Sequence, residues 1–353
     1  MKLKRDDLEK IAPNIVDVPH RKIMMCLNES PVNPFSHIWD KVAEKLGDLA
    51  VNRYHSQNTD DLLEKLADYC NVSPSQIAMG NGADEMIYYF FVMLRSRAED
   101  KIIYPAPSYF DYKTYSKAVG LSQEPVDLLD DLSLDQNSFI QHLEDDNSVC
   151  AIICNPNNPT GNLISKEAII NIIESTEKPV LVDEAYFEFS KTTVIDLIEQ
   201  YENLFVLRTF SKGFLSAGLR FGYIIAKQKS IYELRKVMTA FNLSLVIQSI
   251  ALVYLENIDW FERQIESLIE GRDYLYSSLL SIDGIEPLPS STNFITFRVA
   301  DAKDELFDYL KQSEIAIRSV STHRLLKDCL RVTIGTESEN RLFISAVQSF
   351  FSR

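Results

Sequence analysis

A lysine lies among small and hydroxyl-bearing residues in the segment Arg208-Thr-Phe-Ser-Lys-Gly213, directly after an apolar run. A lysine amine reacts with carbonyl carbons when burial or a nearby cation keeps part of it neutral. Thr209, Ser211 and Arg220 add two hydroxyl groups and a guanidinium, a set that can bind a phosphate. A Ser-Lys pair alone is usually a solvated lysine in a loop, so a role for Lys212 needs support from elsewhere in the chain.

A pair of carboxylates ends a second apolar run, Pro179-Val-Leu-Val-Asp183-Glu184. Ligands of open α/β sheets bind at this carboxyl edge. A metal site of a nucleotide hydrolase is one interpretation, but the chain has no G-x-x-x-x-G-K-[ST] loop to complete it. Alternatively, Asp183 can pair with a protonated ring nitrogen, an attraction of about 4 kcal/mol at an effective dielectric constant near 20. Tyr186 follows closely enough to donate to an oxygen on the same ring.

Two loops between apolar runs supply further polar groups. Asn155-Pro-Asn-Asn158-Pro-Thr-Gly161 is a rigid turn in which Asn158 can offer its amide to a ligand, although an ordinary loop would look the same. Gly80-Asn-Gly82-Ala83-Asp84-Glu85 opens an apolar helical pattern, whose free N–H groups and dipole suit a phosphate. It is not a dinucleotide fingerprint, because Glu85 occupies the third glycine position, and Asp84 can equally be a plain N-cap.

Two arginines near the end of the chain complete the candidate set. Arg331 opens the strand-like run Arg-Val-Thr-Ile, and Arg318 precedes it. Either can bind a carboxylate or phosphate through two parallel hydrogen bonds, whereas a surface salt bridge is the alternative, above all for Arg318. Each cluster is weak by itself, but their order, their placement after strands and their residue types all agree with one cofactor.

These clusters require a sheet that brings strand ends together. Apolar runs alternate with helical patterns between about residues 76 and 226, and several runs are apolar on both faces, as in a parallel sheet covered on both sides. The alternation predicts an α/β layered domain. The seven expected strands are Gln76–Met79, Lys101–Tyr104, Leu121–Val126, Val149–Cys154, Val180–Asp183, Leu204–Arg208 and Phe221–Ala226. The expected helices between them include Ala83–Arg97, Tyr109–Val119, Lys166–Glu174 and Ile231–Ala240.

Beyond residue 245 the pattern changes to a long helical stretch, two strand-like runs (Asn293–Val299 and Cys329–Ile334) and a final helix. We therefore expect a smaller α+β domain there. A length of 353 residues suits this division. The expected parts are an N-terminal segment, 1–36, that packs on the small domain or a partner subunit, a large domain, 37–245, and a small C-terminal domain, 246–353.

Composition excludes several classes of protein. A net charge of −15 argues against nucleic-acid binding. The five cysteines form no C-x-x-C pair and the five histidines are scattered, so we expect a reducing compartment and no metal site. The N-terminus lacks the apolar core of a secretory signal, and no stretch suits a membrane span, so a cytoplasmic location is expected.

In these motifs the chain resembles the fold-type I pyridoxal 5′-phosphate (PLP) enzymes, and among them most the histidinol-phosphate aminotransferases. The resemblance extends over nearly the whole chain in the family's order. The matching pieces are Leu27-Asn-Glu, Gly82-Ala-Asp-Glu85, Pro107-Ser-Tyr109 with Tyr112, Asn157-Asn-Pro-Thr-Gly161, Asp183-Glu-Ala-Tyr186, Arg208-Thr-Phe-Ser-Lys212, Gly218-Leu-Arg220 and Leu330-Arg-Val-Thr-Ile-Gly-Thr336. It implies a large domain with a mostly parallel seven-stranded sheet between helices, a smaller α+β domain, and PLP as the cofactor.

The resemblance also implies a role for each candidate residue. Lys212 would hold PLP as a Schiff base and move the proton between substrate Cα and cofactor C4′, while Asp183 would hold the ring nitrogen. Asn158 and Tyr186 would bind the phenolic oxygen. The remaining cofactor contacts would be Tyr109, stacked on the ring, and Ala83, Asp84, Thr209, Ser211 and Arg220 around the phosphate. Tyr54 would reach the phosphate in a neighbouring subunit, which implies a homodimer. The substrate would meet Arg331, Arg318 and Asn28.

Three segments depart from the family pattern, and they bear on the substrate. Ser30-Pro-Val-Asn33 replaces Asn-Pro-Tyr-Gly, Tyr54-His55 replaces Tyr-Pro, and Gly213-Phe-Leu-Ser216 replaces Ala-Phe-Gly-Leu. The missing aromatic lies near where the family binds the substrate phosphate. We expect amino transfer from a donor such as glutamate to an oxo acid or a phosphorylated ketone.

Two other functions are compatible with the same motifs. A PLP-dependent decarboxylase of the threonine-phosphate decarboxylase type is the alternative enzyme. A PLP-sensing regulator is the non-enzymatic alternative, but it would need a helix-turn-helix module ahead of Asn28, where we expect too little chain.

Overall fold

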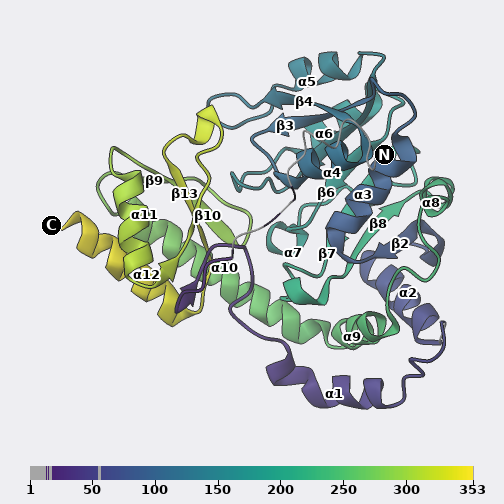
Figure 1. Cartoon of the computed structure of the whole chain (residues 1–353), viewed down its shortest axis with the longest axis horizontal. Helices are drawn as coiled ribbons and strands as arrows, with labels where there is room; N and C mark the ends of the chain where they lie inside the picture. The colour runs from purple at the N-terminus through teal and green to yellow at the C-terminus, as the bar shows by residue number, and fades with distance from the viewer. Residues whose placement is uncertain (1–12, 14, 16–17, 55–56, 353) are drawn as a thin grey trace, which may run out of the picture.

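A computed structural model describes residues 13, 15, 18–54 and 57–352 of the chain. Its largest sheet has seven strands in the order β2-β8-β7-β6-β5-β3-β4 (Figure 1). Only β8 runs antiparallel to its neighbours, β2 and β7. This confirms the α/β fold with a mostly parallel seven-stranded sheet. The strands are β2 (Ile77–Gly80), β3 (Lys101–Ala106), β4 (Ser122–Asp127), β5 (Ser148–Cys154), β6 (Val180–Asp183), β7 (Leu204–Thr209) and β8 (Gly222–Ala226).

Both faces of the central strands β5, β6, β7 and β8 are buried, which explains why these strands are mostly apolar. The edge strand β4 is polar and largely exposed. Along β5, Ile152 packs into one apolar cluster and Ile153 into another on the opposite face. The first cluster is shared with α3 (Gly82–Leu94), α4 (Asp111–Val119) and α8 (Gln228–Arg235). The second is shared with α2 (Gln57–Cys70), α5 (Gln136–Leu143), α6 (Lys166–Glu174) and α7 (Phe187–Ser190). The sheet is therefore a rigid platform for loops at its edge.

Helix α8 departs from its expected bounds. The pattern predicts a helix over Ile231–Ala240, whereas α8 begins at Gln228 and ends at Arg235. The segment that follows bonds to the edge strand β2 instead: the Asn242 amide donates to the Met79 carbonyl at 3.0 Å. This long-range contact overrides a local helical pattern.

The long helical stretch after residue 245 is two helices, α9 (Leu245–Leu255) and α10 (Ile258–Leu280). The Asn257 side chain donates to the Val253 carbonyl at 2.6 Å, at the break between them. In Figure 1, α10 extends from the large sheet towards the smaller one. Helix α1 (Phe35–Gly47) packs on α9. Among the described residues, no helix is long and apolar enough to cross a membrane.

A four-stranded sheet of order β12-β13-β10-β9 forms the other end of the molecule (Figure 1). Its strands are β9 (Ile285–Pro287), β10 (Phe294–Val299), β12 (Arg318–Ser319) and β13 (Cys329–Thr333), and the helices beside it are α11 (Lys303–Gln312) and α12 (Glu337–Phe351). The N-terminal β1 (Ile23–Met24) pairs with β11 (Ile315–Ala316). Four 3₁₀ turns complete the described elements: η2 (Pro74–Gln76), η3 (Ile195–Leu197), η4 (Ala217–Leu219) and η5 (Arg324–Leu326). The domain bounds 1–36, 37–245 and 246–353 stay a prediction.

Candidate active site

The candidate residues gather at the carboxyl edge of three adjacent strands. Asp183 ends β6, where it lies opposite Cys154 of β5 and Leu207 of β7. The N–H of Asn155 donates to the Asp183 carbonyl at 2.9 Å, which ties the Asn158 loop to this edge. Lys212 follows the end of β7. Parallel strands thus bring together motifs that are far apart in the sequence.

Lys212 points into the interior, where its amine contacts the N-terminal segment. The Nζ atom donates to the carbonyls of Asn28 at 3.0 Å and Leu27 at 3.3 Å. Burial, with a smaller contribution from the nearby Arg331 guanidinium, lowers the pKa of Lys212 to about 8. About a tenth of such an amine is neutral at pH 7, against about one part in three thousand for an ordinary lysine. Lys212 can therefore act as a nucleophile and as a base.

Asp183 is a buried carboxylate with two donors. Its Oδ1 accepts from the Ala185 N–H at 3.0 Å, and its Oδ2 accepts from the Tyr112 hydroxyl at 2.5 Å. Burial raises the pKa of Asp183 to about 6, and the two donors oppose that rise. A carboxylate has room for about four hydrogen bonds, so this one can still accept a proton-bearing ring nitrogen. The sequence motifs predict no role for Tyr112. Its position three residues after Tyr109, at the start of a helix, indicates that the two side chains lie on the same helix face.

Asn28, Tyr186, Asn158 and Arg331 join four segments at the other side of the site. The Asn28 amide donates to the Tyr186 hydroxyl at 2.9 Å. Arg331 donates from Nη1 to Asn158 Oδ1 at 2.6 Å and from Nη2 to the Cys26 carbonyl at 3.1 Å. The Nδ2 group of Asn158 is thereby left to donate to a ligand. Arg331 Nε is buried without a hydrogen-bond partner among the described residues, which suits an incoming anion.

The expected phosphate-binding residues form a cradle at the start of α3. Gly82 has a φ of +86°, and a Cβ there would lie 2.6 Å from Nη2 of Arg220. A Cβ at Gly222 would lie 2.4 Å from the Ala83 nitrogen, so β8 presses on the helix N-terminus. Arg220 Nη2 pairs with Asp84 Oδ2 at 2.7 Å. This close backbone approach leaves the first N–H groups of α3 facing the arginine.

The hydroxyl groups of the lysine loop lie beside this cradle. Thr209 Oγ1 donates to Ser211 Oγ at 3.0 Å and lies 3.1 Å from the Phe221 carbonyl, next to Arg220. The Tyr109 hydroxyl donates to Asp84 Oδ1 at 3.0 Å. The structure therefore brings together Ala83, Asp84, Tyr109, Thr209, Ser211 and Arg220, as the motifs predict.

Tyr54 and Arg318 are less integrated. Tyr54 is 79% exposed and stacks on Phe241, with ring centroids 4.9 Å apart. Arg318 is exposed, but it lies directly opposite Arg331 in the β12–β13 pair. Directly opposed residues present their side chains on the same face, so the two guanidinium groups share one side of the small sheet.

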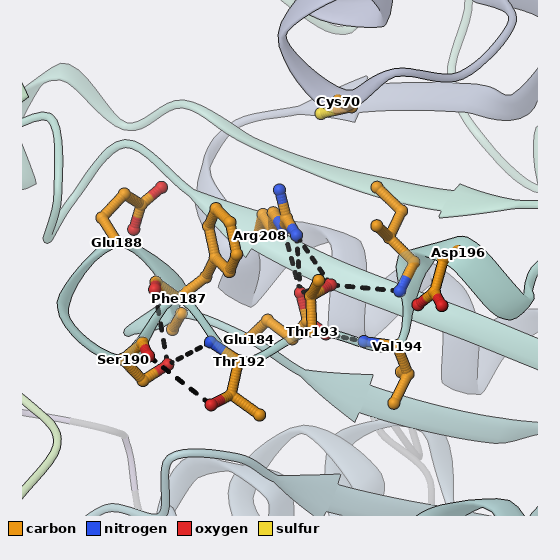
Figure 2. Close-up of polar contacts among 12 residues, drawn as sticks. Cys70, Glu184, Phe187, Glu188, Ser190, Thr192, Thr193, Val194, Asp196 and Arg208 are labelled. Carbon is orange, nitrogen blue, oxygen red and sulfur yellow. Dashed lines mark hydrogen bonds and ion pairs between the residues drawn. The ribbon is translucent and has the colours of Figure 1, made fainter. Parts of the chain in front are cut away.

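A buried ion pair fixes the strand ends beneath the site (Figure 2). Arg208 contacts Glu184 Oε2 through Nη2 at 2.8 Å and Nε at 3.0 Å. Glu184 also accepts from the Thr193 hydroxyl and the Val194 N–H, both at 2.8 Å. The guanidinium lies over the Phe187 ring, 3.6 Å from its centroid. Since Glu184 follows Asp183 and Arg208 precedes Thr209, this pair holds two site residues in place.

Glu188 is a second buried carboxyl, behind the lysine loop. It is 2% exposed, and its Oε2 has no hydrogen-bond partner among the described residues. Burial raises the pKa of Glu188 to about 7. A Cβ on Gly213 would lie 2.4 Å from Cγ of Glu188, so this carboxyl occupies the space beside the residue after Lys212. Glu188 belongs to none of the sequence motifs, and its position between Phe187 and Phe189 is the one local sign of its burial.

The residues present fit PLP as a ligand. A reactive amine, a buried carboxylate with free acceptor positions and a helix N-terminus with an arginine face one region. They match, respectively, a carbonyl carbon, a protonated ring nitrogen and a phosphate.

Comparison with known proteins supports the same conclusion. The family model described as "Aminotransferase class I and II" matches residues 20–347. A histidinol-phosphate aminotransferase from Thermoanaerobacter sp. (strain X514) is 37% identical, over 94% of this chain and 93% of the relative. One from Vesicomyosocius okutanii is 33% identical, over 98% of this chain and 97% of the relative.

Solved structures share the fold. The histidinol-phosphate aminotransferase from Clostridium acetobutylicum has a TM-score of 0.86 at 25% identity, covering 94% of this chain and 99% of that one. The enzyme from Sinorhizobium meliloti, solved in complex with pyridoxal 5′-phosphate, has a TM-score of 0.88 at 21% identity, covering 100% and 98%. An L-threonine-O-3-phosphate decarboxylase from Porphyromonas gingivalis, at 22% identity, has a TM-score of 0.79 and covers 94% and 100%. The last two likenesses concern the fold alone.

Proposed function

The chain belongs to the class I and class II aminotransferase family, and from this premise we propose that it moves an amino group between glutamate and a phosphorylated ketone, with histidinol phosphate as the amino product. It is a PLP-dependent aminotransferase. The substrate proposal is supported by relatives of 31–37% identity over nearly the full length, all named for that substrate. The decarboxylase alternative has support from the fold alone.

When bound, PLP supplies a carbonyl carbon that condenses with amines and a ring that accepts electrons. We propose that Lys212 would hold the cofactor through its partly neutral amine and would carry the proton at the substrate Cα. Asp183 would accept the ring nitrogen N–H. Asn158 Nδ2 and the Tyr186 hydroxyl would donate to the phenolic oxygen, since Arg331 and Asn28 already engage the other atoms of these two groups.

The phosphate and the ring face have their own proposed contacts. Tyr109 would stack on the ring, because its hydroxyl is anchored on Asp84 at the phosphate end. The phosphate would be held by the first N–H groups of α3, the two loop hydroxyls and a guanidinium, that is, by Ala83, Asp84, Thr209, Ser211 and Arg220.

Arg331 and Arg318 carry the substrate proposal. Their opposed positions place two guanidinium groups side by side, and Arg331 Nε is buried and unpaired among the described residues. Two cations suit a phosphate dianion, while Arg331 alone suits the carboxylate of glutamate, so one site can serve both substrates. Asn28 orients Tyr186 and lies at the Lys212 amine, which puts it beside the reacting carbon.

We propose a homodimer in which Tyr54 reaches the neighbouring subunit's cofactor phosphate. The support is a pocket whose apolar lining residues include Tyr54, Met238 and Phe241, and the exposure of 79% for Tyr54 and 62% for Phe241. Exposed aromatic surface of this kind marks a protein interface. The five buried free cysteines are in keeping with a proposed cytoplasmic location.

The function is tested with purified protein loaded with PLP. Histidinol phosphate, aromatic amino acids and threonine phosphate are each supplied with and without 2-oxoglutarate, and glutamate and carbon dioxide are measured. We expect glutamate from histidinol phosphate, with the parallel double-reciprocal lines of a ping-pong reaction. Carbon dioxide from threonine phosphate without any need for an oxo acid would instead establish the decarboxylase.

A further inference from the structure

Tyr112 is fully buried beneath the site and contacts two of its residues. The residue lies in the first turn of α4 and has an exposure of 0%. Its hydroxyl donates to Asp183 Oδ2 at 2.5 Å. Its ring packs edge-on against Tyr109, with centroids 5.4 Å apart and an interplanar angle of 84°. One side chain therefore touches both the carboxylate proposed for the ring nitrogen and the aromatic ring proposed to stack on the cofactor.

The surroundings of Asp183 otherwise disfavour its charge. Burial raises its pKa, and the neighbouring carboxylates Asp84 of α3 and Glu184 raise it further. Cys154 of β5 and Tyr186, two further titratable neighbours, are buried and their pKa values are raised, so they bring no charge that would help. The charged form is favoured by the Tyr112 hydroxyl and the Ala185 N–H.

Tyr112 is suited to this task because it is a donor at every working pH. Burial and the Asp183 charge hold the pKa of Tyr112 well above 10, so the hydroxyl keeps its proton. A donor that stays protonated stabilises only the ionised form of the carboxyl it faces. A substitution of Ala185 leaves its backbone N–H donor in place, whereas a substitution of Tyr112 can remove its hydroxyl donor.

We propose that Tyr112 is a positioning residue that keeps Asp183 ionised and aimed, so that the proton shared between this carboxyl and the cofactor's ring nitrogen resides on the nitrogen. The inference rests on the proposed contact between Asp183 and that nitrogen. Its consequence concerns the cofactor's capacity as an electron acceptor, because a protonated ring withdraws electrons and a neutral ring does so weakly. Tyr112 would thus influence the reaction without touching the cofactor or the substrate.

The test reads the protonation of the ring nitrogen directly. PLP labelled with ¹⁵N in the ring is bound to the full-length protein, and its ¹⁵N chemical shift is followed across the pH range without any substrate. The variant is Tyr112→Phe, which removes only the hydroxyl. The matched control is Tyr104→Phe, because Tyr104 packs edge-on against Tyr112 but is not among the donors to Asp183 in the described structure. Asp183→Asn gives the reference shift of an unprotonated ring.

We expect a protonated shift in the wild type and in Tyr104→Phe, and in Tyr112→Phe a shift moved towards the Asp183→Asn value. The dissociation constant of PLP should rise about tenfold to a hundredfold in Tyr112→Phe, as is typical for one lost hydrogen bond to a charged group. A wild-type shift in Tyr112→Phe overturns the proposal. A protonated ring in Asp183→Asn would instead refute the Asp183 contact, and neither result depends on which substrate the enzyme uses.

A second measurement covers the case in which Tyr112→Phe fails to fold. Incorporation of 3-fluorotyrosine at position 112 keeps the hydroxyl and the shape but makes the phenol a better donor. At a fixed pH the ring-nitrogen ¹⁵N shift should then equal the wild-type value or lie farther towards the protonated side, because the stronger donor further favours the ionised carboxyl. A shift moved towards the Asp183→Asn value would contradict the proposal.

Discussion

The chemistry of Lys212 depends on its surroundings more than on its neighbours in sequence. Burial and the Arg331 guanidinium lower the pKa of its amine to about 8. Because the neutral amine is the reactive form, reactivity should rise as pH increases through 8 and should be complete well below the 10.5 of an ordinary lysine.

Competitive acylation of the PLP-free protein at varied pH, read out by peptide mass mapping, measures this pKa. We expect a midpoint near 8 for Lys212, a midpoint above 10.5 for the control Lys229, whose pKa is raised by its hydrogen bond to Glu202, and a higher midpoint for Lys212 in Arg331→Met. Lys212→Ala should abolish both covalent PLP attachment and turnover. Turnover at the wild-type rate in that variant would refute the proposed role of Lys212.

Glu188 makes stability depend on pH with a definite sign. Its folded pKa of about 7 lies above its ordinary value of 4.5, so the folded protein binds the proton more tightly than the unfolded chain. Its contribution to stability is therefore fully present below pH 4.5 and is lost as pH rises through 7. The Arg208 and Lys191 cations reduce this loss but do not cancel it.

Glu188→Gln should accordingly raise the free energy of unfolding at pH 8, by up to about 3 kcal/mol, and change it little at pH 5. Urea denaturation at the two pH values measures the difference. Glu144→Gln, an exposed carboxyl at the end of α5, is the control and should show no such pH dependence. An equal effect of Glu188→Gln at both pH values would contradict a protonated, buried Glu188.

At the scale of elements, the site is supported by contacts that hold strand ends and loops in register. The Glu184–Arg208 pair links the ends of β6 and β7, and Gly222 lets β8 approach the start of α3. Glu188 of α7 fills the space beside Gly213, where the family pattern has an alanine. This departure from the family pattern therefore has a local steric reason.

Gly213→Ala should destabilise the protein by about 1–3 kcal/mol, because the new Cβ overlaps Glu188 and must displace either α7 or the lysine loop. Gly218→Ala in the same loop is the matched control, since a Cβ there meets nothing within 4 Å. The double variant Gly213→Ala/Glu188→Ala should recover part of the loss. Equal denaturation midpoints for the two single glycine variants would show that the overlap relaxes without cost.

At the scale of the whole molecule, the site joins the two sheets. The Arg331–Asn158 hydrogen bond spans from β13 to the loop after β5. A second contact between the two parts is an ion pair: the Asp127 carboxylate at the end of β4 lies 2.9 Å from Arg324 of η5. The position of the small sheet therefore determines where the substrate's anionic end can bind.

The proposed dimer belongs to the same scale. Phe241→Asp places a charge on the exposed aromatic surface beside Tyr54, so sedimentation should show monomers in place of dimers, together with weaker PLP retention. Leu342→Asp on α12, another exposed apolar residue with 54% exposure, should leave both properties unchanged. A wild-type protein that sediments as a monomer would refute the dimer.

What the sequence by itself determined are the local features of this protein. The runs and their endings predicted all seven strands of the large sheet, because burial of the central strands on both faces leaves a pattern along the chain. Since parallel strands end at one edge, the same pattern placed Asp183, Asn158 and Lys212 together. Family resemblance then supplied their expected roles and the cofactor.

Only the tertiary structure decided which groups meet. The Asn28–Tyr186 and Arg331–Asn158 hydrogen bonds join residues 158 and 173 positions apart, and the Tyr112–Asp183 bond joins residues 71 apart. Such contacts depend on how helices and sheets pack, and periodicity records that a residue is buried but not its partner. Packing between distant segments also explains two local features. Helix α8 ends at Arg235, and Glu188 occupies the space that a Cβ on Gly213 would need.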